Sequence, residues 1–442
     1  MMKITHPTPA PHISAGKTTA IPGKQPPFTR YQVFVVAILA LLQFTVILDF
    51  MVLSPLGALL IRELGITPKQ FGWVVSAYAF SAGVAGLLAA GFADRFDRKK
   101  LLLFFYAGFV LGTLLCGIAP GYVFLLVARI ITGLFGGVVS AIAFAIVTDL
   151  FPPGQRGRVM GFVQMAFAAS QVMGIPLSLY LANAWGWHAP FLLIVGISGA
   201  AGAAIAVFLK PVNAHLQLQR DGNAPGHLAR VLANPHYLKG IGAITLLATG
   251  GFMLMPFASA FTVNNLGIPL ADLPTIYLIT GVCAMVAGPL AGKWSDRAGA
   301  YRVFLRGSCL AMVAIAVYCH LGVTPLWLVV LVNVIMIMGI TSRMIAASAL
   351  MTAIPAPPDR GAYLSIQSSV QQISGGLASV LGGFIVTQTD GGALQHFNVL
   401  GNVVVGTTLL SIGLMYVIDR SIKQKALSQQ ALPAAKAPLE PA

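Results

Sequence analysis

The sequence predicts an all-α membrane protein whose twelve transmembrane helices form two pseudo-symmetric six-helix bundles. Of its 442 residues, 57% are hydrophobic and only 9% are charged, and the mean hydropathy is +0.84. A soluble domain carries about 25% charged residues, so this chain is too apolar for a water-exposed surface. The apolar residues come in runs of about 20, the length that crosses a hydrocarbon core of about 30 Å as a helix. In addition, charged landmarks of the first half recur in the second half.

The chain begins with residues 1–30, which are rich in Pro, Thr and Lys and are expected to form a disordered cytoplasmic tail. Residues 31–210 form the N-terminal six-helix bundle. Its apolar runs lie at about 34–60, 72–93, 100–119, 122–150, 158–183 and 189–210. The first run is too long for the apolar part of a signal peptide and ends without a small-residue cleavage pattern, so we expect it to remain as a membrane helix.

A polar stretch at 211–236 is expected to form a central cytoplasmic loop, and residues 237–420 to form the C-terminal six-helix bundle. The apolar runs of this bundle lie at about 238–263, 274–292, 303–321, 326–353, 361–388 and 397–418. Residues 421–442 are rich in Ala, Pro and Gln, and we expect a second disordered cytoplasmic tail there. Glycines and prolines inside the runs allow close helix packing and kinks. They include Pro55, Gly133, Gly137, Pro176 and Pro256.

Two charged landmarks indicate that the second bundle repeats the first. The pair Asp296-Arg297 follows the pair Asp94-Arg95 by 202 positions, and Arg360-Gly361 follows Arg156-Gly157 by 204 positions. Each landmark lies after an even number of helices, so its two copies lie on the same side of the membrane. The repeat therefore predicts parallel halves related by an axis along the membrane normal.

The distribution of basic residues predicts the orientation of the chain. If both termini are cytoplasmic, 23 of the 27 Lys and Arg residues lie on the cytoplasmic side. Only Arg62 and Lys69 lie outside, and Arg129 and Arg343 lie within helices. Cytoplasmic loops carry an excess of Lys and Arg. We therefore expect a multi-pass protein of the inner (plasma) membrane with both termini in the cytoplasm.

Several classes of function lack support in the sequence. The net charge of +15 comes without an RNA-binding module or interleaved exposed aromatics, which argues against nucleic acid as a partner. No nucleotide-binding loop of the type G-x-x-x-x-G-K-S/T is present, and the eight histidines show no metal-ligand spacing. The four cysteines lie in apolar runs without C-x-x-C spacing. We therefore expect neither an enzyme nor a bound cofactor or metal.

The loop between the second and third runs resembles a motif of the major facilitator superfamily. Residues 90–100 read A-G-F-A-D-R-F-D-R-K-K, which is similar to the family's G-x-L-A-D-R-x-G-R-R/K, with Asp97 in place of a Gly. Arg129-x-x-x-Gly133 in the fourth run resembles a further family motif, and Gly174-Ile175-Pro176 resembles part of the family's antiporter motif. The resemblance covers residues 31 to about 420. It implies alternating access, and it is greatest to the proton-coupled drug and sugar efflux group.

The resemblance also implies a cytoplasmic gate. In the family pattern, charges at Asp94, Arg98 and Asp149 form a cluster near the N-terminus of helix eleven, whose dipole favours a carboxylate. This cluster latches the cytoplasmic side in the outward-open state. We assign Arg95 and the second copy, Asp296-Arg297, to the same gate. The alternative is that these charges only fix the topology. Position 300, equivalent to Arg98, is Ala, so the latch is expected mainly in the first half.

Asp49 is the candidate proton-coupling residue. Of the twelve Asp and Glu residues, it alone lies well inside an apolar run. A charge at the centre of a bilayer costs about 2.5–3.5 kcal/mol on insertion scales, so it is expected to face a cavity or a partner. Arg129 lies at comparable depth and is the candidate partner. Desolvation disfavours a charged carboxyl and a nearby cation favours it, so such a group suits proton exchange. The alternative is a static pair that joins helices one and four.

Arg343 is the other cation inside a helix, with no carboxylate at matched depth. It could face a central cavity and bind an anionic substrate group, or it could extend to the cytoplasmic face. We leave both possibilities open. Other polar and aromatic residues are candidates for lining the substrate cavity, although some of them could simply bridge helices. They are Gln43, Tyr78, Gln164, Gln171, Phe252, Asn333, Gln367 and Gln371.

The sequence therefore predicts a secondary active transporter that works by alternating access. The favoured mode is proton-coupled efflux, by antiport, of small amphipathic molecules, drugs or sugars. The alternatives are a proton symporter that imports a small organic anion and a transporter-like sensor that binds a ligand without moving it. The expected partners are a small-molecule substrate, protons and the lipid bilayer, and the chain is expected to act as a monomer.

Overall fold

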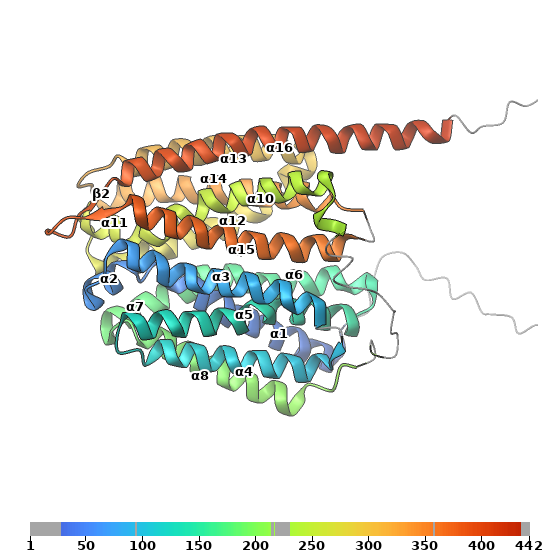
Figure 1. The fold of residues 1–442 in the computed structure, drawn as a ribbon, viewed down its shortest axis with the longest axis horizontal. Helices are drawn as coiled ribbons and strands as arrows, with labels where there is room; N and C mark the ends of the chain where they lie inside the picture. The colour runs from blue at the N-terminus through green and yellow to red at the C-terminus, as the bar shows by residue number, and fades with distance from the viewer. Residues whose placement is uncertain (1–27, 93–94, 214–215, 217–229, 357–358, 435–442) are drawn as a thin grey trace, which may run out of the picture.

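The computed structural model describes residues 28–92, 95–213, 216, 230–356 and 359–434. These residues form an elongated bundle in which most helices run along the long axis (Figure 1). The only strands among them, β1 (Thr387–Gln388) and β2 (Leu394–Gln395), form an antiparallel hairpin at one end. We call this end the hairpin end, and the opposite end, where the last helix stops, the tail end.

The first half of the chain supplies six spanning segments. Three of these helices begin with recognisable signals. Helix α1 has a capping box at Thr29 and Gln32, and α6 and α8 have a Pro in the first turn. The elements are α1 (Arg30–Val52), α2 (Gly57–Leu64), α3 (Pro68–Phe92), α4 (Arg98–Gly117), α5 (Tyr122–Leu150), α6 (Pro153–Ala169), the π-helical turn η2 (Ser170–Gly174), α7 (Ile175–Trp185) and α8 (Ala189–Phe208).

The second half supplies six more. Its elements are α10 (Pro235–Leu254), the 3-10 turn η4 (Met255–Phe257), α11 (Ala258–Asn264), the 3-10 turn η5 (Leu270–Asp272), α12 (Leu273–Ala298), α13 (Ala300–Cys319), α14 (Leu326–Thr352), α15 (Arg360–Ile385) and α16 (Phe397–Ala434). Among the described residues, 11 helical segments are long and apolar enough to cross a membrane. The twelfth segment is α15, which has sufficient length but carries polar residues such as Gln371 and Gln372.

A break near a proline divides the first segment of each half. Helix α1 ends at Val52 and α2 begins after Pro55, while α10 ends before Pro256 and α11 follows it. Pro lacks a backbone N–H and its ring clashes with the carbonyl four residues earlier, so it interrupts a helix. Pro256 follows Pro55 by 201 positions, close to the spacings of the charged landmarks. The two breaks are therefore at equivalent positions of the repeat. The first predicted run, at about 34–60, was expected to be one helix and is divided into α1 and α2.

These two breaks meet at the hairpin end. The Ser259 hydroxyl donates to the Ser54 carbonyl oxygen (2.9 Å) and accepts a hydrogen bond from the Ala58 backbone N–H (3.3 Å). Ser54 lies in the interrupted turn between α1 and α2, where its carbonyl oxygen also accepts a hydrogen bond from the Gly57 N–H (3.0 Å), and Ala58 lies in the first turn of α2, where the N–H groups have no partner within the helix. Ser259 of the second half thus forms hydrogen bonds with the backbone at the break of the first half. These bonds join the two halves at this end.

Glycine allows the helices to approach closely. An added Cβ at Gly137 of α5 would lie 2.6 Å from the Ala82 Cα and carbonyl oxygen of α3, and one at Gly72 would lie 2.8 Å from the Ser379 carbonyl oxygen of α15. In a bilayer, burial of apolar surface does not drive helices together, so van der Waals packing through small residues carries much of the association. Helices α3 and α15 pack together along most of their length, which joins the two halves lengthwise.

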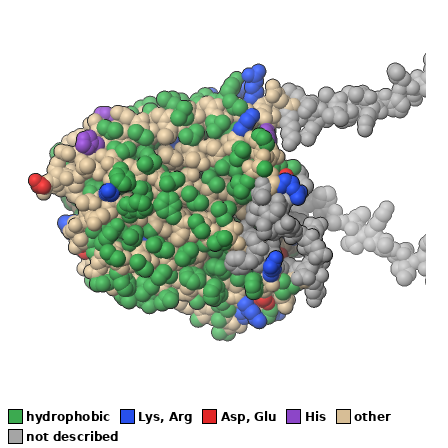
Figure 2. All heavy atoms as spheres, in the orientation of Figure 1, with side chains coloured by type: hydrophobic (Ala, Val, Ile, Leu, Met, Phe, Trp, Pro, Cys, Tyr) green, Lys and Arg blue, Asp and Glu red, His purple; other side chains and the backbone are tan. Residues whose placement is uncertain are grey.

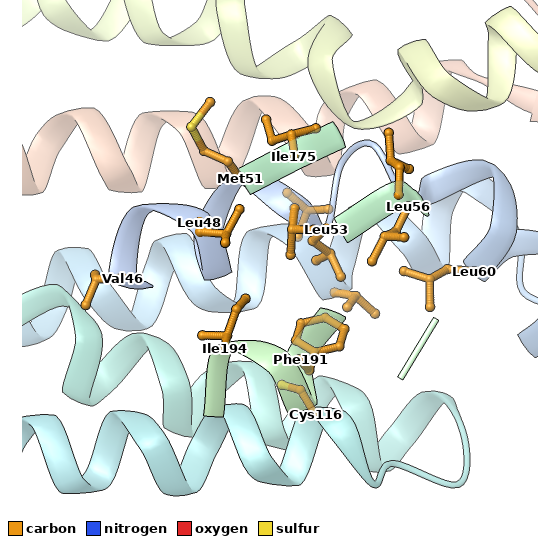
Figure 3. Packing of buried hydrophobic residues seen from close by; sticks show 14 of the residues in the cluster. Val46, Leu48, Met51, Leu53, Leu56, Leu60, Cys116, Ile175, Phe191 and Ile194 are labelled. Atoms are coloured by element: carbon orange, nitrogen blue, oxygen red, sulfur yellow. The ribbon is translucent and has the colours of Figure 1, made fainter. Parts of the chain in front are cut away.

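The packing within the first half is dense next to the α1 break. Leu53 and Leu56 from the break, Phe191 and Ile194 of α8, and Ile175 of α7 lie around one another (Figure 3). All five side chains are buried. Interiors of proteins are packed like organic crystals, so this contact fixes the position of the break relative to α7 and α8.

The outer surface of the bundle is apolar between its two ends. Leu88, Phe104 and Leu410 are 62–65% exposed. In Figure 2, hydrophobic side chains cover the middle of the visible face, and most Lys and Arg side chains on it lie toward the tail end. Monomeric soluble proteins rarely expose patches larger than a few hundred Å², so the surrounding lipid is the natural cover for this surface.

The structure corrects one boundary of the sequence prediction. Helix α16 continues to Ala434, so residues 421–434 are helical, whereas the sequence predicted a disordered tail from 421 onward. A salt bridge between the Lys423 Nζ and Asp419 Oδ2 atoms (2.6 Å) supports this extension, because residues four apart are neighbours on a helix. Residues 1–27, within the predicted N-terminal tail, and most of the predicted central loop lie outside the described residues.

We expect Gly137→Val to destabilise the first bundle. Its side chain would push α5 away from the α3 backbone, and overpacking of this kind costs about 1–3 kcal/mol. The measurement is the melting temperature of the detergent-solubilised protein. Gly196→Val is the matched control, because an added Cβ at Gly196 of α8 meets no atom within 4 Å. Equal melting temperatures for the two variants would show that close contact between α3 and α5 does not limit stability.

Candidate functional site

Asp49 and Arg129 form a buried ion pair inside the first bundle. The Arg129 Nη1 atom lies 2.8 Å from Asp49 Oδ2 and also donates to the Asp49 backbone carbonyl oxygen at 3.4 Å. Asp49 is 0% exposed and Arg129 is 1% exposed. Asp49 lies on α1 and Arg129 lies on α5. The structure therefore brings the two candidate proton-coupling residues into direct contact, away from both ends of the bundle.

The glycine of the Arg129-x-x-x-Gly133 motif has a packing role beside this pair. Gly133 lies one helical turn beyond Arg129, and an added Cβ there would collide with the Ser81 hydroxyl and the Tyr78 carbonyl oxygen of α3. This close approach places the Tyr78 ring over the guanidinium, with the Arg129 Cζ atom 4.6 Å from the ring centroid. A cation over an aromatic face is attracted by the ring quadrupole. Tyr78, which the sequence named as a candidate for the substrate cavity, thus lies against the Arg129 side of the ion pair.

Thr113 of α4 completes the surroundings of the carboxylate. Its hydroxyl lies 3.2 Å from Asp49 Oδ1 and 3.0 Å from the Phe109 carbonyl oxygen, so its single proton can serve either acceptor. Asp49 therefore has a charged donor on one oxygen and a switchable neutral donor on the other. If Arg129 moves away, Asp49 is left with one weak donor, and protonation becomes the way to remove its buried charge.

A π-helical turn, which ends at Gly174 of the Gly174-Ile175-Pro176 segment, packs next to Asp49. Pro176 cannot donate to a carbonyl of the preceding turn, and residues 170–174 are wound as η2 instead. The Ser170 hydroxyl lies 3.1 Å from the Phe44 carbonyl oxygen of α1. An added Cβ at Gly174 would lie 2.6 Å from the side chain of Leu48, the neighbour of Asp49. This turn therefore packs directly on the helix that carries the acid.

The same turn touches the second half of the chain. An added Cβ at Gly281 of α12 would lie 2.9 Å from the Gln171 carbonyl oxygen, so α12 rests against the backbone of η2. The side chain of Gln171 itself is half-buried. Contacts at Gly281 and Gly174 thus connect α12 to η2, and η2 to α1.

Aromatic residues form a second contact between the halves at this depth. Phe50, the residue after Asp49, has its ring centroid 5.2 Å from that of Tyr78 and 5.8 Å from that of Phe252. Phe252 comes from α10 and packs against Gly375 of α15, where an added Cβ would lie 2.9 Å from its ring. Tyr78 and Phe252, both expected in the cavity, are therefore linked through Phe50.

The other predicted cavity residues do not converge on one space. Gln43 is buried and accepts a hydrogen bond from the Ser140 hydroxyl (2.7 Å), so it bridges α1 and α5. Gln164 is exposed on α6, and the Asn333 amide donates to the Val329 carbonyl oxygen of its own helix. Gln367 and Gln371 of α15 are half-buried, and the Gln367 Oε1 atom has no donor among the described residues.

Two cavities of about 300 and 460 Å³ lie at the hairpin end. Arg62 of α2 lines both, and the larger one also meets Gln388 and Gly392 of the hairpin region. Neither is lined by a residue that the sequence predicted for the substrate cavity. These cavities are therefore separate from the Asp49–Arg129 pair.

Arg343 is buried within the second half. It is 2% exposed, and its Nη1 atom donates to the Thr408 hydroxyl of α16 at 3.0 Å. The alternative in which this side chain extends to the bundle surface is therefore wrong. Its guanidinium points toward α16 and Gly250 of α10.

Two residues that the sequence assigned to the gate, Arg98 of the loop motif and Asp149 of α5, form an ion pair. The Arg98 Nε atom lies 3.2 Å from Asp149 Oδ2, and Arg98 is buried. Asp97, the departure from the family pattern, caps α4 by accepting from the backbone N–H groups of Lys99 (2.8 Å) and Lys100 (3.2 Å). Arg95 is exposed, and Asp94 lies outside the described residues.

The second copy of the motif has a different environment. Asp296 and Arg297 are exposed near the end of α12, which stops at Gly299 with a positive φ of 90°. Neither residue forms an ion pair with another described residue. The two copies of the motif therefore differ in ion pairing among the described residues.

Sequence reasoning missed several residues around these sites. They are Thr113, Ser140, Phe50, Ser259 and Thr408. Hydroxyl residues are frequent within apolar helices and usually bond to the carbonyl three or four residues earlier. The only signal of the four hydroxyl residues was a polar side chain in an apolar run, and no spacing distinguishes a contact across helices from a local one. Phe50 is one of many aromatic residues in the apolar runs and had no signal of its own.

Comparisons with known proteins place this architecture in a family. The family model of the Major Facilitator Superfamily matches residues 39–340 and matches again at 240–441, starting 201 positions later. An uncharacterized MFS-type transporter of Bacillus subtilis, YceJ, is 23% identical over 384 residues, which is 87% of this chain and 96% of the relative. A chloramphenicol efflux pump of Mycobacterium tuberculosis is 26% identical over 247 residues, 55% of this chain and 59% of the pump.

Other relatives match part of the chain or the fold alone. Multidrug resistance protein 3 of Bacillus subtilis is 33% identical over 163 residues, 37% of this chain and 31% of that protein. The crystal structure of a bacterial homologue of the human lysosomal transporter Spinster superposes with a TM-score of 0.72 at 16% identity, covering 90% of this chain and 99% of that one. The D-xylose–proton symporter gives 0.69 at 16% identity, covering 86% and 97%. The twelve-segment chain described here therefore belongs to the major facilitator superfamily.

Proposed function

We propose that this transporter is a proton-coupled efflux pump that exchanges protons for small amphipathic molecules, drugs or sugars, by alternating access. The observation that carries the proposal is the buried Asp49–Arg129 pair. Partial support comes from relatives named for multidrug resistance and chloramphenicol efflux. Members of this superfamily work by rocking two bundles around a site near the membrane midplane.

The ion pair suits proton coupling because the paired and the separated arrangements of the two charged side chains differ strongly in free energy. While Arg129 contacts Asp49, the charges compensate one another in the apolar bundle. Removing one partner from a buried pair is strongly destabilising, by about 3–5 kcal/mol, because the remaining charge is uncompensated. Protonation of Asp49 removes its charge. A motion that separates the pair is therefore coupled to proton uptake, and re-formation of the pair is coupled to proton release.

The contacts around the pair supply a route between the proton site and the second half. Helix α12 rests on η2, which packs on α1 beside Asp49, and Phe252 of α10 packs on Phe50. A rocking motion of the second half changes both contacts. In this proposal the substrate occupies the region between the halves near Phe50 and Phe252, and rocking then alters the contact between Asp49 and Arg129.

We further propose that the tail end faces the cytoplasm, with both termini on that side of the inner membrane. The excess of Lys and Arg at this end supports the assignment. The Arg98–Asp149 pair then lies on the cytoplasmic side. We propose that it belongs to a latch with Asp94 near the N-terminus of α15, where it holds the cytoplasmic side closed in the outward-open state.

The alternative of proton-coupled import of an organic anion depends on Arg343 facing the substrate. The guanidinium is instead held by α16 and buried to 98%, so a drug-sized substrate has no observed access to it. This geometry favours efflux of an amphipathic molecule over uptake of an anion. A sensor without transport would show ligand binding but no flux in the assays below.

Asp49→Asn is expected to abolish gradient-driven transport while leaving exchange of substrate intact. The protein is reconstituted in proteoliposomes with chloramphenicol as the probe, and transport is followed with and without an imposed pH gradient. The variant carries no titratable group at position 49, so an outward substrate flux no longer depends on the gradient. Substrate counterflow without a gradient persists because the alternating-access motion needs no net proton movement.

Glu63→Gln is the control, because Glu63 is exposed on α2 and should keep full coupling. A static pair gives a different result for Asp49→Asn: the folded yield, the counterflow and the gradient-driven flux all fall together. Gradient-driven flux at the wild-type level in a folded Asp49→Asn variant would refute the coupling role.

Loss of the Arg98–Asp149 contact is expected to lower the transport rate, because the contact is part of the proposed gate. Asp149→Asn removes an ion pair that is partly exposed and worth about 1 kcal/mol, which shifts an equilibrium between two conformations by about fivefold. The measurement is the transport rate at equal expression, and the double exchange of Arg98→Asp with Asp149→Arg should restore part of the loss. Lys423→Gln, which breaks an exposed pair on α16, should leave transport unchanged.

Cysteine labelling tests the proposed orientation. In a background with the four native cysteines replaced by Ala, a membrane-impermeant maleimide should label Gly391→Cys on intact cells, because Gly391 lies in the turn of the hairpin end. Lys423→Cys should react only after the membrane is permeabilised. The reverse pattern would place the termini outside and would contradict the orientation inferred from the basic residues.

A further inference from the structure

The larger of the two cavities at the hairpin end lies on the boundary between the two halves, which we call the seam. Its volume is about 460 Å³. The first half contributes Ile61, Arg62 and Thr67 to its wall, and the second half contributes Asn264 of α11 and Gln388 of the hairpin. The proposed transport mechanism uses none of these residues. Ligand sites commonly have volumes of about 300–1,000 Å³, so this cavity can accommodate a small organic molecule.

The charge of this cavity is positive. Arg62 is the only charged side chain among the described residues that line it, and neither Glu63 nor Asp390 of the hairpin turn is part of the wall. The smaller cavity differs, because Arg62 and Glu63 both line it and their charges oppose one another. The Arg62 side chain forms no ion pair or hydrogen bond with another described residue. Its five N–H donors are therefore available to an anionic ligand.

Uncharged groups complete the wall of the larger cavity. Thr67, Asn264 and Gln388 supply hydroxyl and amide groups, and the Asn264 side chain forms no hydrogen bond with another described residue. Ile61 and Ile66 are buried and supply an apolar side. Ligand sites usually combine apolar walls with a few polar groups that orient the ligand. This wall therefore suits an organic carboxylate better than an inorganic anion, which has no apolar part.

The cavity depends on the contact between the halves at the hairpin end. Beside it, the Asn183 amide of α7 donates to the Leu270 carbonyl oxygen of the second half (3.0 Å), and Leu270 lines both cavities. Alternating access separates the halves at one end of the bundle at a time. When the hairpin end opens, Arg62 moves away from Asn264, so the complete cavity is present only while this end is closed.

We propose that the larger cavity binds a small organic anion, with its carboxylate on the Arg62 guanidinium and its apolar part against Ile61 and Ile66. The anion contacts both halves and favours the conformation in which the hairpin end is closed, because a ligand shifts an equilibrium toward the state that it binds better. It thus regulates the transporter from the hairpin end and is not the transported substrate. This regulation rests on alternating access, whereas binding of the anion does not depend on proton coupling at Asp49.

The first test compares para-fluorobenzoate with para-fluorobenzamide, which have nearly the same shape and differ in charge. Broadening of the fluorine NMR signal of each ligand is measured while purified transporter in detergent is added. We expect a dissociation constant of about 0.1–1 mM for para-fluorobenzoate, given its small number of atoms. The amide should bind at least about tenfold more weakly, because charge-assisted hydrogen bonds are the stronger ones. Equal binding of the two ligands, or no binding of para-fluorobenzoate at about 10 mM, would overturn the proposal.

Two variants, one in each half, locate the ligand. Arg62→Gln should weaken binding of para-fluorobenzoate at least about tenfold, and Asn264→Ala should weaken it about threefold to tenfold. Lys69→Gln and Asp390→Asn are the controls, because both residues are exposed at the same end and neither lines the cavity. Their affinities should stay within about twofold of the wild type. An equal loss in Lys69→Gln and Arg62→Gln would show a general effect of surface charge and would refute the site. Wild-type affinity in Asn264→Ala would place the ligand on the first half alone and would contradict a site on the seam.

Gly72→Val tests the dependence on closure. An added Cβ at Gly72 of α3 would lie 2.8 Å from the Ser379 carbonyl oxygen of α15, so Val opposes closure without lining the cavity. Binding of para-fluorobenzoate should weaken about fivefold or more. Ser259→Ala is a milder second variant that removes hydrogen bonds across the seam, and it should weaken binding in the same direction. Gly196→Val should bind as the wild type does. Wild-type affinity in both seam variants would refute the link to closure. The readout is binding and not flux, so its outcome is independent of whether Asp49 couples transport to protons.

Discussion

The buried ion pair between Asp49 and Arg129 is the constraint around which the first bundle is arranged. Its 2.8 Å contact depends on the depth of two helices in the bilayer and on the rotation of each about its axis. Gly133 allows α5 to approach α3, Gly174 allows η2 to approach α1, and Thr113 reaches the second carboxylate oxygen from α4. Because a separated pair is costly in an apolar interior, these contacts jointly restrict the conformations in which Asp49 stays charged.

The two halves share a backbone plan but differ in their buried charges. Both have a proline break at equivalent positions, and Ser259 joins the breaks at the hairpin end. The first half places Asp49 opposite Arg129, whereas the second places Gly250 opposite Arg343. The repeat thus preserves the helix geometry, while charge chemistry has diverged between the copies. The loop motif shows the same divergence, since Arg98 is paired with Asp149 and the equivalent residue 300 is Ala.

Contacts between the halves use small residues and aromatic rings in place of charges. Glycines of α3, α12 and α15 lie against backbone or ring atoms of the opposite half. The contact of Gly281 with η2 is an example next to the ion pair, and hydrogen bonds such as those of Ser259 join the halves at the hairpin end. The ion pairs between described residues lie within one half, and the Lys69 ammonium of the first half lies over the Phe384 ring of the second. A relative motion of the halves can therefore leave the Asp49–Arg129 and Arg98–Asp149 contacts within the first half.

The sequence by itself determined the features that follow from local composition and periodicity. Apolar runs of membrane-crossing length predicted the twelve segments, and the repeated landmarks predicted two similar halves, because a bilayer admits few alternatives to helices. It also indicated Asp49 and Arg129 as partners, since buried charges in an apolar chain are rare. It could not predict the contacts of Thr113, Phe50 or Thr408, or the burial of Arg343 against α16. These depend on the rotation of each helix, which only the packing of all the helices against one another decides.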